Sequence, residues 1–91
     1  MTKKQLVEIV SKKAHLTKRG AREAVEVFLD EIGRVLSKGE KVLLSGFGTF
    51  LVVPMRGRTV TIPETTKTVT IKPHRSPKFR AGKRLRKQVL R

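Results

Sequence analysis

Residues 41–53 have the sequence KVLLSGFGTFLVV, in which a glycine-rich turn separates two apolar runs. Lys41–Ser45 and Thr49–Val53 are rich in residues that favour strands, and Gly46-Phe47-Gly48 is typical of a tight turn. The stretch therefore predicts an antiparallel strand pair. It also marks the point where the apolar period of the chain changes from 3.6 to 2.

A second hairpin is expected on the C-terminal side. Two alternating runs, Thr59–Ile62 and Thr68–Ile71, flank the turn-like segment Pro63–Lys67. They predict a hairpin, or an extension of the first one, with Thr on one face and Val or Ile on the other. Because proline cannot donate to a strand ladder, Pro73 and Pro77 limit the returning strand to a sheet edge or to irregular structure.

Two helices are expected on the N-terminal side. Thr2 and Gln5 form a Thr-x-x-Gln capping box, which predicts a first helix that ends near Ala14-His15. Thr17 is the expected N-cap of a long amphipathic helix that Gly39 closes. The short connection between them predicts an antiparallel pair. The apolar residues of the long helix recur every three or four positions: Ala21, Ala24, Val25, Phe28, Leu29, Ile32, Val35 and Leu36.

Most of the positive charge lies in the C-terminal third. From Arg56 to Arg91 there are twelve Lys or Arg residues and one acid, Glu64, and the first 55 residues supply only +4 of the net +15. Concentrated charge of this kind is typical of a nucleic-acid binder. Because Thr, Val, Ile, Pro and Gly are interspersed, we expect a folded basic surface. The segment should end in a short helix after Gly82, with Leu85, Val89 and Leu90 as its apolar contacts.

Several classes of protein are disfavoured. The chain has no Cys and two His, so it offers no disulfide framework and no set of metal ligands. No apolar stretch is long enough for a membrane span or a signal peptide, which makes a soluble intracellular protein the expectation. No nucleophile–base spacing, carboxylate pair or phosphate-binding loop indicates an enzyme. We therefore expect no cofactor, no small-molecule substrate and no membrane partner.

The apolar residues are too few and too dispersed for one chain to build a full core. A lone two-stranded ribbon is marginal in water, so an intertwined homodimer that folds on association is expected. Phenylalanines could instead stack on bases, but the chain lacks Tyr and Trp, and core packing is favoured. The expected dimer core is Phe28, Leu29, Ile32, Leu36, Val42, Leu44, Phe47, Phe50 and Phe79.

The segment Gly46-Phe47-Gly48-Thr49-Phe50 belongs to a larger pattern. Two helices precede it, a long hairpin with Pro63 near its tip follows, and the chain ends in Pro77-x-Phe79-x-x-Gly82-Lys83. This arrangement closely resembles the bacterial histone-like HU and integration host factor family over the whole chain. The Gly-Phe-Gly-x-Phe segment, Pro63 and the C-terminal pattern in register make the resemblance specific.

The resemblance implies an α+β fold. The expected architecture is an intertwined homodimer with an N-terminal helical pair, a three-stranded antiparallel sheet extended into a β-ribbon arm, and a short C-terminal helix. We expect a single domain over residues 1–91, with the helical dimerisation part in 1–40, the sheet and DNA-binding arm in 41–82 and the last helix in 83–91. His15 stands where the family commonly has a helix-ending glycine, which favours a C-cap role.

The resemblance also implies a nucleoid-associated, cytoplasmic protein that binds double-stranded DNA through the minor groove with low sequence specificity, and bends and compacts it. Bent, nicked or junction DNA would be favoured. In the family a proline at the arm tip inserts between base steps, and Pro63 matches it; alternatively, Pro63 only shapes the turn. The expected DNA contacts are Arg56, Arg58, Pro63, Lys67, Lys72, Arg75, Lys78, Arg80, Lys83 and Arg86.

The sequence departs from the family at two places. The family tip usually reads Arg-Asn-Pro-x-Thr-Gly, whereas here Thr61-Ile62 precedes Pro63 and Thr66 replaces the Gly, so a positive φ at Thr66 is disfavoured. Leu51, Val53 and Met55 occupy positions that are mostly charged in the family. They either pack against something, such as the C-terminal helix, or leave the binding surface less basic there.

Other interpretations stay open. One is a sequence-specific integration-host-factor-like protein, and another is a structural RNA-binding protein. The bases near the helix starts, which are Lys3, Lys18, Arg19 and Arg22, form either a solvated face or a contact with flanking DNA. The spacings Arg19/Glu23 and Arg22/Glu26 predict intrahelical ion pairs for part of this set.

Overall fold

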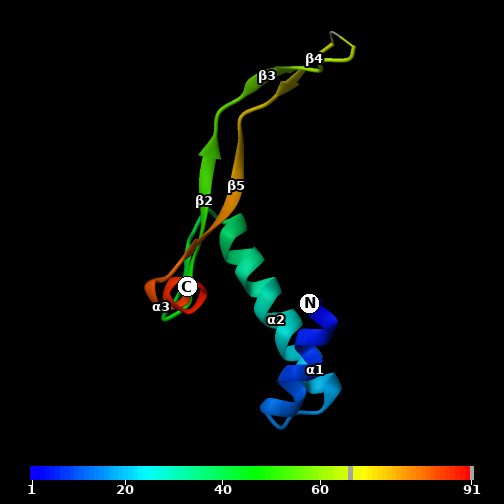
Figure 1. Cartoon of the computed structure of the whole chain (residues 1–91), viewed down its shortest axis with the longest axis vertical. Coiled ribbons are helices and arrows are strands. Elements are labelled where there is room, and N and C mark those ends of the chain that lie inside the picture. The colour runs from blue at the N-terminus through cyan, green and yellow to red at the C-terminus, as the bar shows by residue number, and fades with distance from the viewer. Residues whose placement is uncertain (66, 91) are drawn as a thin grey trace. The chain divides into compact units, whose positions relative to one another are not determined.

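The computed structural model of the chain describes residues 1–65 and 67–90. The chain forms two compact units, Met1–Val35 and the part from Leu36 to its C-terminal end. The division falls inside the second helix, a few residues before the boundary near residue 40 that the sequence predicts. Helices come first, strands follow, and a last short helix ends the chain (Figure 1).

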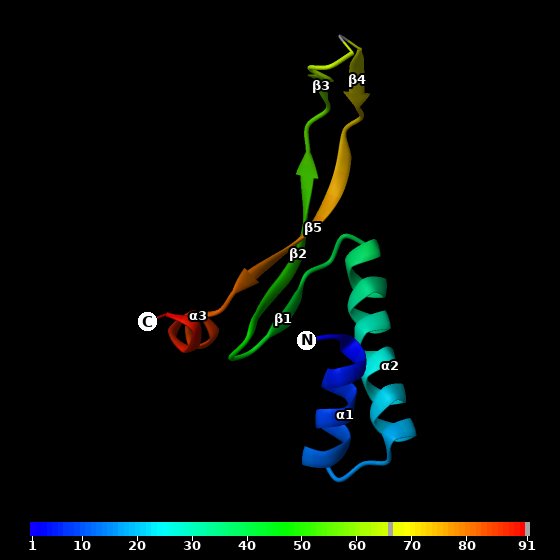
Figure 2. The same ribbon diagram turned by 45° about the vertical axis from the view of Figure 1, so that its right-hand side comes forward.

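The first unit is a helix pair. Helix α1 (Lys3–Lys13) starts with the predicted capping box, because the Thr2 hydroxyl accepts from the Gln5 amide at 3.2 Å and Gln5 Oε1 accepts from the Thr2 amide at 2.8 Å. Helix α2 (Lys18–Ser37) starts at Thr17, whose hydroxyl accepts from the Gly20 amide at 3.0 Å. Within this unit the two helices run antiparallel and side by side (Figure 2).

Helix α1 ends in a Schellman motif. The Leu16 amide donates to the Ser11 carbonyl at 2.9 Å, and the His15 amide donates to the Lys12 carbonyl at 3.4 Å. This pairing requires His15 to adopt φ = 57°, and it is the one non-glycine residue with positive φ among those described. The structure thus confirms that His15 ends the helix.

The second unit contains a three-stranded antiparallel sheet in the order β1-β2-β5, formed by β1 (Val42–Leu44), β2 (Gly48–Met55) and β5 (His74–Ala81). The turn that joins β1 to β2 places Gly46 at φ = 81°, and the Phe47 amide donates to the Leu44 carbonyl at 2.9 Å. The turn is thus centred on Ser45 and Gly46. Gly48, predicted as part of the turn, is instead a buried residue of β2.

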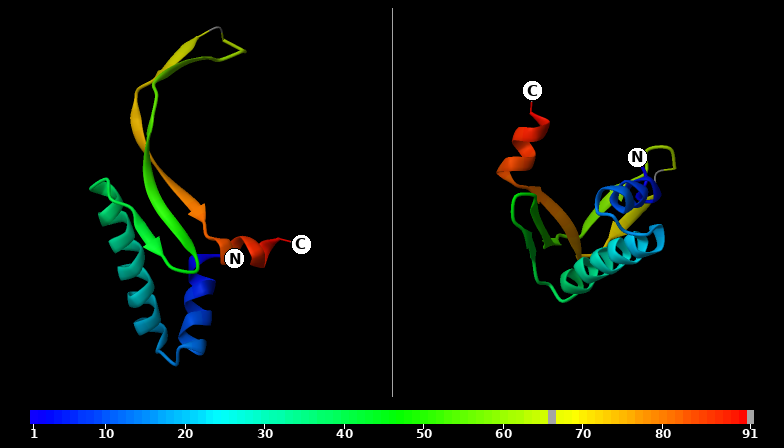
Figure 3. Two further views of the ribbon diagram at one scale, coloured as in Figure 1. Left: turned by 90° about the vertical axis from the view of Figure 1, so that its left-hand side faces the viewer. Right: turned by 90° about the horizontal axis from the view of Figure 1, so that it is seen from below.

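The predicted second hairpin is formed by β3 (Arg58–Thr61) and β4 (Thr68–Ile71), and the ribbon of β2 and β5 continues into it (Figure 3). The prolines lie where a missing amide does no harm. Pro77 lies in β5, which is the edge strand that the sequence predicts, and Pro73 lies between β4 and β5. Pro54 lies in the part of β2 that β1 does not reach.

Helix α3 (Lys83–Val89) begins at Gly82, whose amide donates to the Phe47 carbonyl at 2.8 Å. Leu85 is half-buried as expected. The expected packing of Val89 and Leu90 is wrong within one chain, because their exposed fractions are 73% and 78%. The helix is seven residues long, and no described part of the same chain covers its C-terminal end.

Very little of the chain is buried. Among the described residues, Val7 and Ala21 are the only buried hydrophobic side chains. The members of the predicted dimer core are half-buried or exposed, with Phe28 at 52%, Phe47 at 47% and Phe79 at 42%. A single copy therefore leaves most of its predicted core in contact with water.

Candidate nucleic-acid interface

One face of the sheet carries the phenylalanine cluster. The register pairs Phe50 with Phe79, whose ring centroids lie 4.8 Å apart, and Phe47 lies 5.4 Å from Phe79. Val52 and Pro77 form the next pair along this face. The three predicted core aromatics of this unit are thus brought together, on a side of the sheet that is mainly apolar.

The opposite face of the sheet has two rows of different chemistry. On β5 the row contains Arg80, Lys78, Ser76 and His74, and on β2 the paired row contains Thr49, Leu51, Val53 and Met55. Leu51 and Val53 are half-buried beside these cross-strand neighbours. The β2 row of this face carries no cation, whereas the paired β5 row contributes Lys78 and Arg80, so the face is basic along one strand.

The predicted cations of the ribbon divide between its faces. Lys78 and Arg80 lie on the face of Leu51. Arg75 is paired with Pro54 on the phenylalanine face, and Arg58 shares its face with Ile71 in the distal hairpin. Because alternate side chains of a strand point to opposite sides, Arg75 and Arg80 cannot both contact the same flat surface here.

Arg75 has a partner within the chain. Its Nη2 donates to the Ser37 carbonyl at 3.2 Å, at the C-terminal end of α2 where helix carbonyls lack intrahelical partners. Gly39 lies directly beside this guanidinium. The sequence places Arg75 among the DNA contacts, but the structure gives its guanidinium a capping role.

The ladder is interrupted between the two hairpins. Met55 pairs with His74 and Arg58 pairs with Ile71, which leaves Arg56-Gly57 and Lys72-Pro73 unpaired. The same number of residues is skipped on each strand, so the register continues without a bulge. A β-carbon on Gly57 would lie 2.8 Å from Pro73 Cδ and 2.9 Å from the Ile71 carbonyl oxygen, so the strands approach closely at this joint.

The far end of the ribbon is a compact turn. The Ile62 amide donates to the Lys67 carbonyl at 2.8 Å, and the Thr65 amide donates to the Ile62 carbonyl at 3.3 Å. Pro63 is exposed at this turn, as an inserting residue would have to be. The prediction about the backbone of Thr66 concerns a position outside the described residues.

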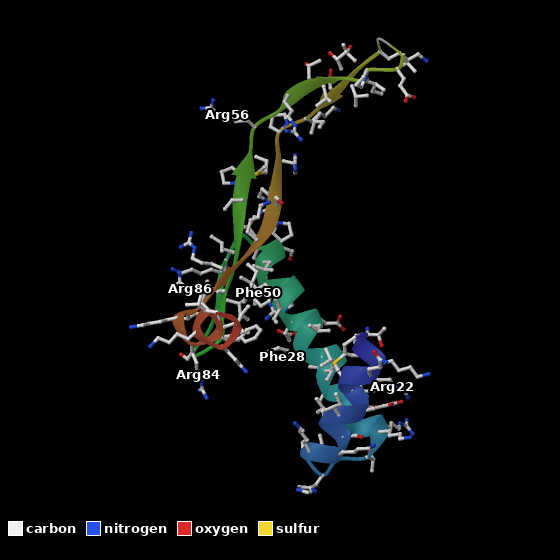
Figure 4. The ribbon with its side chains drawn as sticks, viewed as in Figure 1. Arg22, Phe28, Phe50, Arg56, Arg84 and Arg86 are labelled. Atoms are coloured by element: carbon white, nitrogen blue, oxygen red, sulfur yellow. The ribbon has the colours of Figure 1, made fainter. Side chains whose placement is uncertain are left out.

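Helix α3 presents cations from the other end of the ribbon. Lys83, Arg86 and Lys87 are spaced three and four residues apart and so share one face of the helix. Arg84 lies on another side, where its side chain approaches Gly46 (Figure 4). The predicted set of DNA contacts did not include Arg84 and Lys87. Lys87 lies four residues after Lys83 and so on the same helix face, and this spacing is the signal that could have identified it.

The helix pair has a second basic surface. A groove of about 320 Å³ lies between α1 and α2, lined by Val7, the acids Glu8 and Glu26, and the bases Lys3, Lys4, Lys18, Arg19 and Arg22. The Lys3 ammonium lies 2.7 Å from Glu26, and Arg19 lies 3.8 Å from Glu23. The predicted Arg22–Glu26 pair is wrong: among the described residues the ion pair of Glu26 is made with Lys3, because α1 brings that base closer.

The interface thus combines a cationic strand row, a cationic helix face and a ribbon with an exposed proline at its end. The sequence model of a family described as bacterial DNA-binding protein matches residues 1–90, nearly the whole chain. This chain belongs to the HU and integration host factor family. No helix among the described residues combines the length and the apolar character that crossing a bilayer requires.

Individual family members are similar over almost their full lengths. HU from Thermotoga maritima is 40% identical over 89 residues, which cover 98% of this chain and 99% of that protein. The integration host factor alpha subunit of Hydrogenovibrio crunogenus is 39% identical, with 98% and 92% covered. A cocrystal structure of Anabaena HU with DNA superposes with a TM-score of 0.92 at 37% identity, covering 99% of this chain and 98% of that one. The family is a DNA-binding one, and its α+β fold is the fold of this chain.

Proposed function

We propose that two copies of this chain form a homodimer that binds double-stranded DNA through the minor groove, with little direct base readout, and that bends and compacts it in the cytoplasmic nucleoid. The observation that supports this best is the cationic surface of Lys78, Arg80, Lys83 and Arg86, in a member of a DNA-binding family. The role is architectural and needs no catalysis or cofactor.

The homodimer is supported by what one chain leaves exposed. Phe28, Leu29, Phe47 and Phe79 each have more than two fifths of their surface in water. Burying a large apolar side chain contributes about 1.5–3 kcal/mol, so these residues favour association strongly. Because so few side chains are buried within one copy, folding and association should be a single event.

The mode of binding follows from the charge and from the exposed tip. Lys and Arg side chains gain affinity by neutralising phosphates and releasing counterions. An exposed proline at the ribbon tip can enter between base steps at a cost of a few kcal/mol for unstacking, after which bent DNA meets more basic surface. The protein's affinity for a given DNA should then depend on how easily that DNA bends, so nicked and junction substrates should bind more tightly.

The experiment is a mobility-shift titration of linear, nicked and four-way-junction DNA at two salt concentrations, with sedimentation equilibrium of the free protein. We expect a dimer, tighter binding to the nicked and junction substrates, and a steep loss of affinity with salt. A monomer, or an affinity for a duplex of about 30 base pairs that hardly changes with salt, would refute the proposal.

A sequence-specific function is the second candidate, because relatives named as integration host factor alpha subunits are 38–39% identical to this chain. A binding assay with excess unlabelled competitor DNA distinguishes the two candidate functions. A sequence-specific protein retains one preferred site against excess random duplex, whereas a general binder is displaced in proportion to competitor. Adding structured RNA as a competitor tests the RNA-binding alternative in the same assay.

A further inference from the structure

The outer part of the distal hairpin, which we call the tip hairpin (residues 59–71), has almost none of the charge that surrounds it. Residues 59–71 contain one base, Lys67, and one acid, Glu64, so they carry no net charge. The flanking positions Arg56, Arg58 and Lys72 are all cations. Since counterion release depends on charge, the tip hairpin cannot supply a large electrostatic part of binding.

The two faces of the tip hairpin are chemically distinct. Thr59 pairs with Thr70 and Thr61 pairs with Thr68, so one face presents four threonines. The other face presents Val60 opposite Val69, with exposed fractions of 39% and 46%. All residues of β3 are exposed, and so are the threonines of β4. This hairpin is therefore an accessible surface of hydroxyl and methyl groups.

The threonine face of the tip hairpin is chemically complementary to the minor groove of DNA, the proposed ligand. The minor groove of A·T pairs presents only acceptors, adenine N3 and thymine O2, and threonine hydroxyls are neutral donors of the right size. A G·C pair adds the guanine 2-amino group, a donor that projects into the groove. Threonine methyl groups can pack against deoxyribose without any change in charge.

Resting on the proposed function, we infer that the tip hairpin contacts the minor groove through its threonine face, as an uncharged reader that favours A·T pairs, and that its contribution to affinity does not depend on salt. The salt dependence then comes from the cations of β5 and α3. This division assigns two separable parts of the binding free energy to two ends of one ribbon.

The test compares salt slopes of the full-length protein on a duplex of about 30 base pairs. Thr59→Val with Thr61→Val removes two hydroxyls and keeps shape and strand propensity. Both copies of the dimer carry the substitutions, so four hydroxyls are lost. Loss of about one hydrogen bond each should reduce affinity roughly 30- to 1,000-fold at every salt concentration, with an unchanged slope. Lys78→Gln with Arg80→Gln should instead flatten the slope by about 3.6, which is about 0.9 for each of the four phosphate contacts that the homodimer loses.

Val60→Thr is the matched control, because it adds a hydroxyl on the opposite face and should leave affinity unchanged. Replacing guanine by inosine removes the 2-amino group, so a duplex with I·C pairs should bind like one with A·T pairs and more tightly than one with G·C pairs. The threonine variant should reduce this difference. Wild-type affinity of the threonine variant, or a change in its salt slope, would overturn the inference.

Failure of this inference is distinguishable from failure of the proposed function. If the wild-type protein does not bind duplex DNA, or binds with a flat salt slope, the proposed function itself fails. If the wild type binds with a steep slope while the threonine variant is indistinguishable from it, only the role of the tip hairpin is refuted. The variants replace exposed side chains, so folding, checked by thermal unfolding, should be unaffected.

Discussion

The ring of Phe79 fills the space beside Gly48, where a β-carbon would lie 2.5 Å from Cζ of Phe79 and 2.6 Å from the Arg80 carbonyl oxygen. The second residue of the Gly-Phe-Gly segment, Phe47, belongs to the phenylalanine cluster, and the third, Gly48, lies against both the Phe79 ring and the Arg80 backbone. Glycine is required at position 48 for close packing, whereas Gly46 is required for a positive φ.

Gly48→Ala should destabilise the protein by about 1–3 kcal/mol or more, because a methyl group overpacks a site whose neighbour is backbone. Gly33→Ala is the control. Apart from its own helix, no described part of the chain lies within 4 Å of a β-carbon there, so the substitution should be neutral or stabilising. Urea unfolding at fixed protein concentration measures both. An equal loss at the two positions would show that the packing around Phe79 is not the cause.

His15→Gly should stabilise the protein by up to about 1 kcal/mol. The residue has φ = 57°, which is strained for a residue with a side chain, although greater freedom of the unfolded glycine offsets part of the gain. His15→Ala keeps the strain and loses any local polar interaction, so it should not stabilise. The order of the three melting temperatures, with Gly highest, checks this. A higher melting temperature for His15→Ala than for His15→Gly would contradict the explanation by backbone strain.

Arg75→Gln should reduce stability by about 1 kcal/mol, because it removes the cation that donates to the Ser37 carbonyl at the end of α2. Arg80→Gln, on the other face of β5, should change stability by less than about 0.5 kcal/mol and should weaken DNA binding instead. Denaturant unfolding and a binding titration separate the two effects. If Arg75→Gln weakens DNA binding while stability stays constant, Arg75 contacts DNA, as the sequence predicts, and does not cap α2.

Pro63→Ala should reduce DNA bending, measured by energy transfer between the ends of a duplex, more than it reduces binding to DNA that is already kinked. The reason is that a kinked substrate has already incurred the cost of unstacking. Glu64→Gln changes the neighbouring residue in the same turn and should leave the bend intact. Equal losses on both substrates would indicate that Pro63 only shapes the turn.

The parts of the fold that follow from local signals were predictable from the sequence. The capping box at Thr2, the break at Gly39 and the alternation around Pro63 depend on neighbouring residues, and the structure confirms the elements they predict. The partners that charged side chains find on other elements were not predictable. Glu26 binds Lys3 rather than Arg22, and Arg75 reaches a carbonyl 38 residues away, because packing of separate elements decides both.

The candidate site was predictable in composition but not in arrangement. The basic residues were evident from the charge count, whereas their division between the two faces follows from the register of β2 with β5. Arg75 and Arg80 are an odd number of residues apart on β5, so their split between the faces was in principle available from the alternation of side chains along a strand. The packing of Phe79 over Gly48 was not, since it depends on the twist of the sheet.

The uninterrupted register across the joint at Gly57 and Pro73 has a consequence for how such ribbons can change in length. Deleting one residue from each strand would turn every side chain beyond the joint to the reverse side, exchanging threonine for valine toward any given partner. Removal or addition of two residues per strand would preserve the orientation. Length variants of this arm should therefore be tolerated in evolution, and in engineering, only in even steps.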